Sequence, residues 1–411
     1  MGHIRIARLP FYYGWVNVGV AAVAMSATLP GRTYGLGLIK EPLRADLGVS
    51  DLRFNVINFW AIVIGAVACL PIGRLIDRFG TRAVLAGVVA SLGASVVLMS
   101  RAADESGLIL TLTLVRGLGQ GALSIVAIAL VGKWFKRRVG PAMGVFTVLL
   151  AIGFLAPIFA VGEAVKAAGW RAAWEGVGWA LLLGLLPFGW LLARSSPEAC
   201  GVQPDDPASE GDRRGVAMTL MNALVTRSFW AFTLAATLFN FTFSALTLDN
   251  VTLLKEHGLD GAKLNDMILG VLMVSGLPAN FVAGWLARKR PMGKVLAAGV
   301  AVLAASLALF PFVTCTAVAV IYAVLLGVSG GIITVIYFAV YGHTYGRAHL
   351  GSIQSAVQVV SVLSSATGPV ALAACREYAG STQPFFLVSA AIALILAVAA
   401  WMVQPPREGI A

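Results

Sequence analysis

The chain has 411 residues, of which 59% are hydrophobic and only 12% are charged. Soluble domains contain about 45–50% apolar and about 25% charged residues, so this chain could not cover a surface exposed to water. The composition excludes a soluble enzyme and indicates an integral membrane protein with several spans. The formal net charge of +11 must therefore be tested against membrane topology before a nucleic-acid partner is considered.

A membrane-spanning helix needs about 20 consecutive, mostly apolar residues. Twelve runs of the sequence meet this requirement, and the long polar stretch at 195–227 divides them evenly. The predicted spans are residues 13–38, 53–75, 82–101, 107–131, 140–162, 172–194, 228–254, 265–287, 293–312, 315–341, 349–374 and 382–404. The sequence thus predicts an all-α membrane protein with an N-terminal six-helix bundle at 1–194, a cytoplasmic linker at 195–227 and a C-terminal six-helix bundle at 228–411.

Positive charge is distributed unevenly between the two sides of the membrane that these spans define. Lys and Arg outnumber Asp and Glu in the termini and in the even-to-odd connections, including the clusters at 133–138 and 288–290. Because cytoplasmic loops carry excess Lys and Arg, we expect both termini in the cytoplasm and the chain in the plasma (cell inner) membrane. The basic charge is then a topology signal, so the lipid bilayer is an expected partner and nucleic acid is not.

The two halves of the chain resemble each other. Segment 121–132 aligns with segment 331–342, with a glycine at both ends of each. The next matches place Phe135 and Arg137 opposite Tyr345 and Arg347. Duplicated six-span bundles predict a pseudo-symmetric transporter whose binding site lies between the halves, near the middle of the membrane.

Two motifs resemble those of the major facilitator superfamily. The first follows span 2 and consists of Gly73, Asp77, Arg78, Gly80 and Arg82. The second lies in span 4 and reads Arg-Gly-Leu-Gly-Gln-Gly at 116–121. Segments 11–15 and 346–353 are similar to those of the monocarboxylate and oxalate/formate porters. The resemblance implies alternating access by rocking of the two halves, with proton coupling or exchange.

The first motif is expected to control gating. A carboxylate is stabilised by the N-terminus of a helix, so Asp77 should accept hydrogen bonds from the start of span 11. Arg78 and Arg82 are expected to pair with nearby carboxylates. These contacts would latch the outward-open state of the transporter.

Three charged residues fall well inside the predicted spans, namely Arg32, Arg116 and Asp249. An ionisable group at mid-membrane costs about 2.5–3.5 kcal/mol, so it normally faces a cavity or a partner. In the family that the chain resembles, spans 1, 4 and 7 line the central cavity. All three residues are therefore candidates for the transport site.

These three residues suggest different roles. A guanidinium can hold a carboxylate through two parallel hydrogen bonds, so Arg32 is predicted to bind an organic anion. Desolvation favours the protonated form of Asp249, whereas nearby cations favour its charged form, so this residue is predicted to couple protons. It is also predicted to pair with Arg32 when substrate is absent. Arg116 either contacts the substrate, or stabilises the bundle or tunes the coupling. The alternatives are an ion-pairing or snorkelling Arg32, and an Asp249 that lies just above the membrane or pairs with Lys255.

Polar side chains on or beside these spans extend the predicted binding site. Each of them could also be an interhelical hydrogen-bond partner. They are Tyr34, Asn58, Gln120, Asn240, Tyr337, Tyr341 and Gln358.

No catalytic, cofactor or metal-binding pattern occurs in the sequence. It lacks a Walker loop, and its four His and four Cys have no metal-ligand spacing. We therefore predict a monomeric, non-enzymatic carrier without cofactor that moves small organic anions of the monocarboxylate type together with protons. An exporter or exchanger of another small solute, hydrophobic or cationic, is the alternative, because span 8 lacks the cation that many family members carry there.

Overall fold

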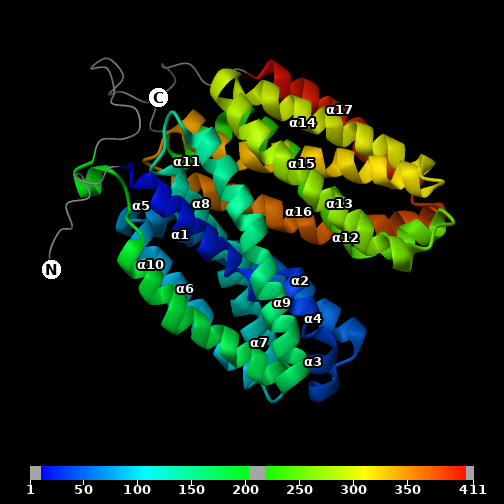
Figure 1. Cartoon of the computed structure of the whole chain (residues 1–411), viewed down its shortest axis with the longest axis horizontal. Helices are drawn as coiled ribbons and strands as arrows, with labels where there is room; N and C mark the ends of the chain where they lie inside the picture. Colours follow the sequence, from blue (N-terminus) through cyan, green and yellow to red (C-terminus); the bar gives the residue numbers. More distant parts are fainter. Residues whose placement is uncertain (1–10, 203–217, 404–411) are drawn as a thin grey trace. The chain divides into compact units, whose positions relative to one another are not determined.

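The computed structural model describes residues 11–202 and 218–403, and within these ranges the chain is helical and contains no strand (Figure 1). The helices of the first half are α1 Gly14–Ser26, η2 Leu29–Gly31, α2 Thr33–Gly37, α3 Lys40–Leu47, α4 Asp51–Ala68, α5 Leu70–Phe79, α6 Thr81–Ser100, α7 Glu105–Val115, η3 Arg116–Leu123, α8 Ser124–Gly132, α9 Val139–Trp179, η4 Ala180–Leu185, α10 Leu186–Leu192 and η5 Glu198–Cys200. Those of the second half are α11 Leu220–Val225, α12 Arg227–Glu256, α13 Gly261–Lys289, α14 Met292–Leu309, η7 Phe310–Phe312, α15 Thr316–Tyr345, α16 Leu350–Ala379 and α17 Gln383–Met402.

The predicted all-α membrane fold is confirmed. Among the described residues, ten helical stretches are long and apolar enough to cross a membrane. One of them, Val139–Leu192, contains Gly169 at φ +81°, a conformation that ends one helix and starts another. This stretch therefore covers two predicted spans, and α1 covers the start of the first predicted span.

The helices form two compact units, and each includes a short piece of the opposite half of the chain. Among the described residues, the first unit takes 11–137, 149–202, 218–220 and 345–359, and the second takes 138–148, 221–344 and 360–403. The first turns of α16 are thus grouped with the first unit. The division into bundles at 1–194 and 228–411 stays a prediction, and linker residues 203–217 lie outside the described part of the chain.

The first span is broken, whereas the sequence analysis expected one continuous helix over 13–38. Helix α1 ends at Ser26, a short 3-10 turn follows at Leu29–Gly31, and Arg32 adopts an extended conformation before α2 begins. Pro30 has no N–H to donate within a helix, which explains the interruption. Hydropathy alone did not reveal this break, because it averages over a run in which Pro30 and Arg32 are surrounded by mostly apolar residues.

Glycines of the second motif allow three spans to approach closely. A Cβ atom at Gly119 would lie 3.0 Å from the Cα of Gly31 in the broken first span. A Cβ atom at Gly117 would lie 3.1 Å from the Cα of Gly65 in α4. Both distances are tighter than most contacts of a Cβ atom, so a larger side chain would force the facing backbone to move by a few tenths of an ångström.

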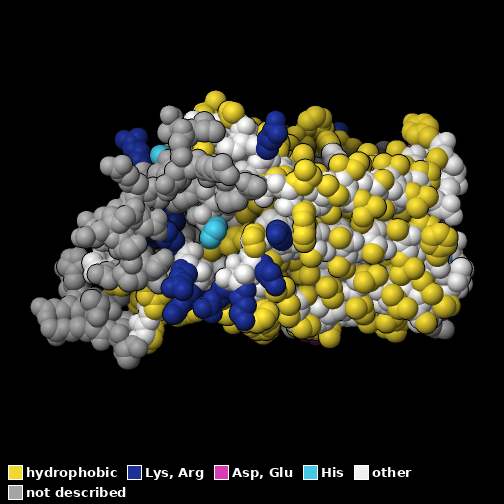
Figure 2. All heavy atoms as spheres, turned by 90° about the horizontal axis from the view of Figure 1, so that it is seen from above, with side chains coloured by type: hydrophobic (Ala, Val, Ile, Leu, Met, Phe, Trp, Pro, Cys, Tyr) yellow, Lys and Arg dark blue, Asp and Glu magenta, His cyan; other side chains and the backbone are white. Residues whose placement is uncertain are grey.

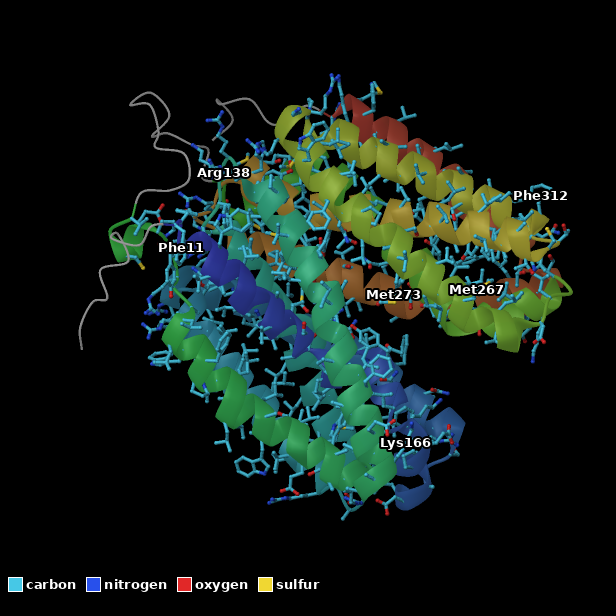
Figure 3. The ribbon with its side chains drawn as sticks, in the orientation of Figure 1. Phe11, Arg138, Lys166, Met267, Met273 and Phe312 are labelled. Carbon is cyan, nitrogen blue, oxygen red and sulfur yellow. The ribbon has the colours of Figure 1, made fainter. Side chains whose placement is uncertain are left out.

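The exterior of the protein is hydrophobic, as expected for a surface in contact with lipid. Phe159 is 70% exposed and Leu183 is 72% exposed, which would be costly in water. Figure 2 shows a largely hydrophobic face on which the visible Lys and Arg side chains gather in one region. In Figure 3, Phe11 and Lys166 lie near opposite ends of the helices of the first unit.

Candidate functional site

The break in the first span positions Arg32 in the first unit. Its Nε donates to the Thr28 hydroxyl at 3.1 Å, and its Nη2 donates to the Ser124 hydroxyl of α8 at 2.9 Å. Within the described part of the chain, its Nη1 makes no hydrogen bond, and the side chain is partly exposed. The Thr28 and Ser124 hydroxyls, together with the Met25 sulfur at 3.7 Å from Nη2, therefore hold the guanidinium in place while leaving Nη1 for a ligand.

Arg116, in contrast, is fully occupied by the protein. It is 2% exposed, and its Nε and Nη2 both donate to the Asn58 side-chain oxygen, at 2.9 and 2.6 Å. Its Nη1 donates to the backbone carbonyl of Gly31 at 2.9 Å, with longer contacts to Gln120 and Thr33 at 3.3 and 3.4 Å. The residue thus satisfies a carbonyl beside the break in the first span and joins spans 1, 2 and 4.

The other predicted site residues of this unit connect to Arg116 or lie near the break. The backbone carbonyl of Gln120 accepts a hydrogen bond from Gln358 on α16 at 3.4 Å. Tyr34 on α2 is 47% exposed and makes an edge-to-face contact with Phe154, with ring centroids 5.4 Å apart. Arg116, Asn58, Gln120 and Gln358 therefore form one hydrogen-bonded group in the first unit, and their contact with substrate stays a prediction.

Three predicted site residues, Asn240, Tyr337 and Tyr341, lie in the second unit and contact neighbouring helices or each other. Asn240 on α12 donates to the Ser361 hydroxyl at 2.8 Å. The hydroxyl of Tyr341, which is completely buried, lies 2.9 Å from that of Thr233. Tyr337 packs against the ring of Tyr341 at 6.0 Å between centroids. These contacts describe helix packing, and a role in substrate binding stays a prediction.

Asp249 lies near the end of α12, two residues beyond the apolar stretch Arg227–Thr247. The cation that the structure places beside it is Arg376 on α16, whose Nη1 is 4.0 Å from the Asp249 carboxylate. Sequence analysis did not single out Arg376, because that residue follows the predicted span 11 and is far from Asp249 along the chain. The pairing of Asp249 with Arg32 stays a prediction.

The loop motif after span 2 makes the helix contact that was predicted for it. The Asp77 carboxylate accepts hydrogen bonds from the backbone N–H groups of Gly351 and Ser352, at 3.1 and 2.9 Å, and from the Ser352 hydroxyl at 2.7 Å. These donors lie in the first turn of α16, where backbone N–H groups have no partner within the helix. A side chain at Gly73 would collide with the backbone carbonyl of Gly351, so this glycine is required for the contact.

The expected carboxylate partners of the motif arginines are not found in the described part of the chain. Arg82 donates to the backbone carbonyl of Trp190 at 2.8 Å, and its guanidinium lies 4.4 Å from the centre of that indole ring. Arg78 lies over the ring of its neighbour Phe79. Gly80, at φ +82°, makes the sharp turn between α5 and α6. The tertiary structure places a carbonyl and aromatic rings beside these cations, which a linear motif cannot show.

Lys133 and Arg347 complete this cluster, although the sequence analysis treated Lys133 as a topology signal only. The Lys133 ammonium is 3.2 Å from the Asp77 carboxylate, and both side chains are 12% exposed. Arg347 donates to the Lys133 carbonyl at 2.6 Å and to the Glu198 carboxylate at 2.8 Å. Burial raises the pKa of Glu198, but a backbone hydrogen bond and the positive charge of Arg347 lower it by more. The pKa of Glu198 therefore lies below its ordinary value.

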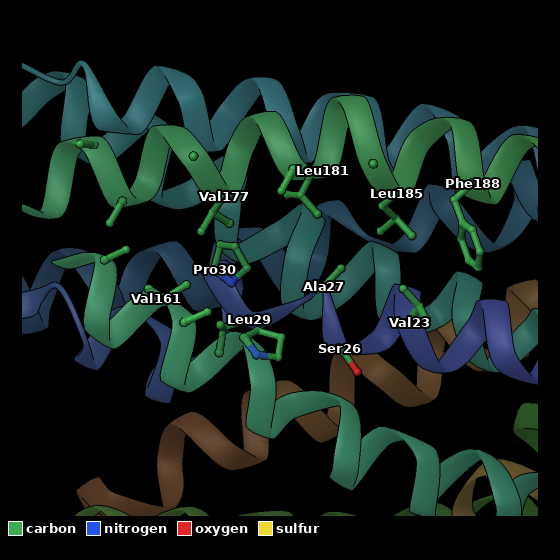
Figure 4. A pocket seen from close by; sticks show the side chains of 18 residues that line it. Val23, Ser26, Ala27, Leu29, Pro30, Val161, Val177, Leu181, Leu185 and Phe188 are labelled. Atoms are coloured by element: carbon green, nitrogen blue, oxygen red, sulfur yellow. The ribbon is translucent and has the colours of Figure 1, made fainter. Parts of the chain in front are cut away.

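An apolar cavity of about 730 Å³ lies beside the break in the first span (Figure 4). Leu29 and Pro30 line it together with residues of α9, η4 and α10, and Arg32 is not among its lining residues. The single hydroxyl in its wall, that of Ser26, already donates to the backbone carbonyl of Ala22. Without a charged side chain, this cavity does not fit a small anion.

Comparison with known proteins agrees with this architecture. Residues 15–369 match the family described as Major Facilitator Superfamily. The chain is 27% identical to "Monocarboxylate transporter 13" of Rattus norvegicus over 391 residues, which cover 93% of this chain and 87% of that protein. It is also 27% identical to "Monocarboxylate transporter 11" of Homo sapiens, over 93% of this chain and 81% of the relative.

Among solved structures, the chain is similar to a major facilitator superfamily transporter, FucP, crystallised in the outward conformation. The TM-score is 0.69 at 13% sequence identity, and the alignment covers 95% of this chain and 97% of FucP. Because the identity is low, this similarity concerns the fold alone. The family match spans most of the sequence and agrees with both sequence motifs, so the chain is a non-enzymatic transporter that belongs to the major facilitator superfamily.

Proposed function

We propose that this protein is a secondary active transporter of small organic anions of the monocarboxylate type, coupled to protons and working by alternating access. The observation that carries the proposal is the Arg32 guanidinium, which Thr28 and Ser124 orient and which keeps its Nη1 without a hydrogen bond among the described residues. A guanidinium with unused donors suits a carboxylate, which accepts two parallel hydrogen bonds. The names of the two mammalian relatives support the same substrate class.

Uptake of labelled carboxylates into proteoliposomes, with and without an imposed pH gradient, tests this proposal. Charged hydrogen bonds contribute about 1.5–3 kcal/mol, so Arg32→Gln should lower apparent substrate affinity by roughly 10- to 100-fold. Arg101→Gln is the matched control, since Arg101 is 64% exposed and pairs with Glu175 at the surface. Unchanged affinity for every anion in monodisperse Arg32→Gln would remove Arg32 from the site and refute the proposal.

We assign proton coupling to Asp249, since a carboxylate with a loosely placed cation can gain and lose a proton during transport. Asp249→Asn should transport without dependence on the pH gradient. Retention of full pH-driven uptake by this variant would contradict the assignment. The predicted monomer, the cytoplasmic position of both termini and the plasma-membrane location belong to the same proposal, and terminal reporter fusions test the orientation.

The contact of Asp77 with α16 supports a gating role for the loop motif, with Gly73, Gly80, Arg78 and Arg82 shaping the loop. Asp77→Asn removes the charge that the helix N-terminus and Lys133 stabilise. The variant should populate the latched conformation less, which labelling of a single cysteine introduced near residue 352 would report as faster modification. Unchanged labelling would contradict a latch.

The alternative substrate class is a hydrophobic or cationic small solute. The apolar cavity beside the first span, with about 730 Å³ and no charged lining residue, is the observation that favours it. Transport of a lipophilic cation by the same proteoliposomes, together with no transport of any carboxylate, would establish this alternative instead.

A further inference from the structure

A group of charged side chains joins α12 and α16 in the second unit. The Arg376 Nε donates to the Glu256 carboxylate at 2.6 Å, and the Arg376 Nη1 lies 4.0 Å from the Asp249 carboxylate. The Thr382 hydroxyl donates to the other oxygen of Glu256 at 3.3 Å. The three charged side chains are only 27–33% exposed, so water screens their interaction less than it would on an open surface.

The two carboxylates hold Arg376 unequally. Asp249 and Glu256 are seven residues apart on one helix, which places them two turns apart on the same face. Glu256 makes a short hydrogen bond and is itself oriented by Thr382. Asp249 is close enough for attraction but too far for a hydrogen bond. The Nη2 of Arg376 is buried and has no hydrogen-bond partner in the part of the chain that the structure describes. One side of the guanidinium is therefore fixed, and the other is available.

We propose that Arg376 is the counter-ion of Asp249 and that it sets the pH at which this carboxylate takes up a proton, with Glu256 orienting the guanidinium. The inference rests on the proton-coupling role proposed for Asp249. Arg376 acts through Asp249 and is a positioning residue.

The charges of the group explain how a proton would favour an anionic substrate. Two carboxylates and one guanidinium carry a net charge of −1, which repels an approaching organic anion. Protonation of Asp249 neutralises the group and removes this repulsion, while Arg376 stays bound to Glu256. Because the 4.0 Å separation involves no hydrogen bond, Asp249 can gain a proton without breaking one. Proton binding and anion binding would thus support each other.

Other helices packed against α12 contribute little charge near Asp249. Helix α17 contains no charged residue, and the Lys294 ammonium of α14 lies over the ring of Trp401, near the end of α17. Helix α13 has Lys263 and Asp266 near its start, and their side chains lie outside the described residues. Among the described charged side chains, Arg376 and Glu256 are therefore those whose charge acts on Asp249.

Opposite shifts in two variants test the proposal in proteoliposomes. An adjacent cation lowers the pKa of a carboxyl group by about 1–3. Removal of the cation in Arg376→Gln should therefore move the pH of half-maximal uptake upward by about one unit. Glu256→Gln removes a like charge and frees Arg376 to pair with Asp249, so it should move that pH downward. Arg376→Lys keeps the charge and should stay close to the wild type, as should the surface control Arg53→Gln.

A second readout is independent of transport. Infrared difference spectroscopy of the purified protein follows the protonated carboxyl band, and Asp249→Asn identifies the part of that band that belongs to Asp249. Its midpoint should move upward in Arg376→Gln and downward in Glu256→Gln. Equal midpoints in all variants, or shifts in the same direction, would overturn the inference. Normal midpoint shifts without carboxylate uptake would instead leave the counter-ion in place and refute the proposed substrate class.

Discussion

The hydrogen bonds of Arg116 predict that this residue stabilises the first unit. Arg116→Met would leave two acceptors, the buried Gly31 carbonyl and the partly buried Asn58 side-chain oxygen, without their donor. Each unsatisfied buried group costs about 1–3 kcal/mol, and removal of a buried positive charge returns part of that cost. We expect a net loss of about 2–3 kcal/mol in the free energy of unfolding.

Thermal unfolding of the detergent-purified protein measures this loss. A domain of 150–250 residues changes its midpoint by about 2–4 °C per kcal/mol, so the midpoint should fall by about 4–12 °C. Cys69 is buried, so a thiol-reactive dye reports its exposure on unfolding in a background where the exposed Cys315 and the partly exposed Cys200 and Cys375 are replaced by Ser. Arg116→Lys keeps a donor but lacks the planar fork that reaches Asn58 twice, and should lie between the wild type and Arg116→Met.

A double variant separates the structural role from substrate binding. In Arg116→Met with Asn58→Leu, the unsatisfied Asn58 oxygen is removed, so the double variant should be more stable than the sum of the single changes predicts, by about 1 kcal/mol or more. If Arg116→Met instead unfolds at the wild-type temperature and abolishes uptake, Arg116 contacts the substrate and this reasoning is wrong.

Three further predictions concern stability, each measured as an unfolding midpoint. Gly119→Ala should destabilise the protein by about 1–3 kcal/mol, because a Cβ at this position would lie 3.0 Å from the Gly31 Cα. An unchanged midpoint would mean that spans 1 and 4 can move apart slightly at no cost. Gln354→Leu should stabilise the protein by about 1–2 kcal/mol, because both amide atoms of this fully buried side chain lack hydrogen-bond partners among the described residues. A lower midpoint would mean that the amide does have a hydrogen-bond partner. The pKa of Glu198 is lower in the folded protein than in the unfolded chain, where it is about 4.3. Its pairing with Arg347 therefore stabilises the protein fully above about pH 4.3, and this contribution is lost as the pH falls through the pKa of the folded state. The small midpoint difference between wild type and Glu198→Gln should therefore vanish in acid, and a difference that grows in acid would contradict the assignment.

Much of the fold follows from the composition of local segments. A run of about 20 apolar residues must become a helix in a membrane, because lipid offers no partner for backbone N–H and C=O groups. Arg32, Arg116 and Asp249 could be found in the same way, since charge is rare in such runs. The partner of Asp77 was predictable because its loop motif resembles that of the major facilitator superfamily and because a helix start stabilises a carboxylate.

The sequence by itself determined the membrane class, the helices, the family motifs and the charged candidates, since each depends on residues adjacent along the chain. Only the tertiary structure decided that the first span breaks at Pro30, that the donors of Arg116 are used up by Asn58 and Gly31, and that Arg376 lies next to Asp249. These contacts join residues far apart in sequence. The sequence around an arginine is the same whether its N–H donors are satisfied or free. Packing geometry distinguishes satisfied from free donors, because a change of a few tenths of an ångström between donor and acceptor decides whether a hydrogen bond forms. No linear pattern encodes such differences.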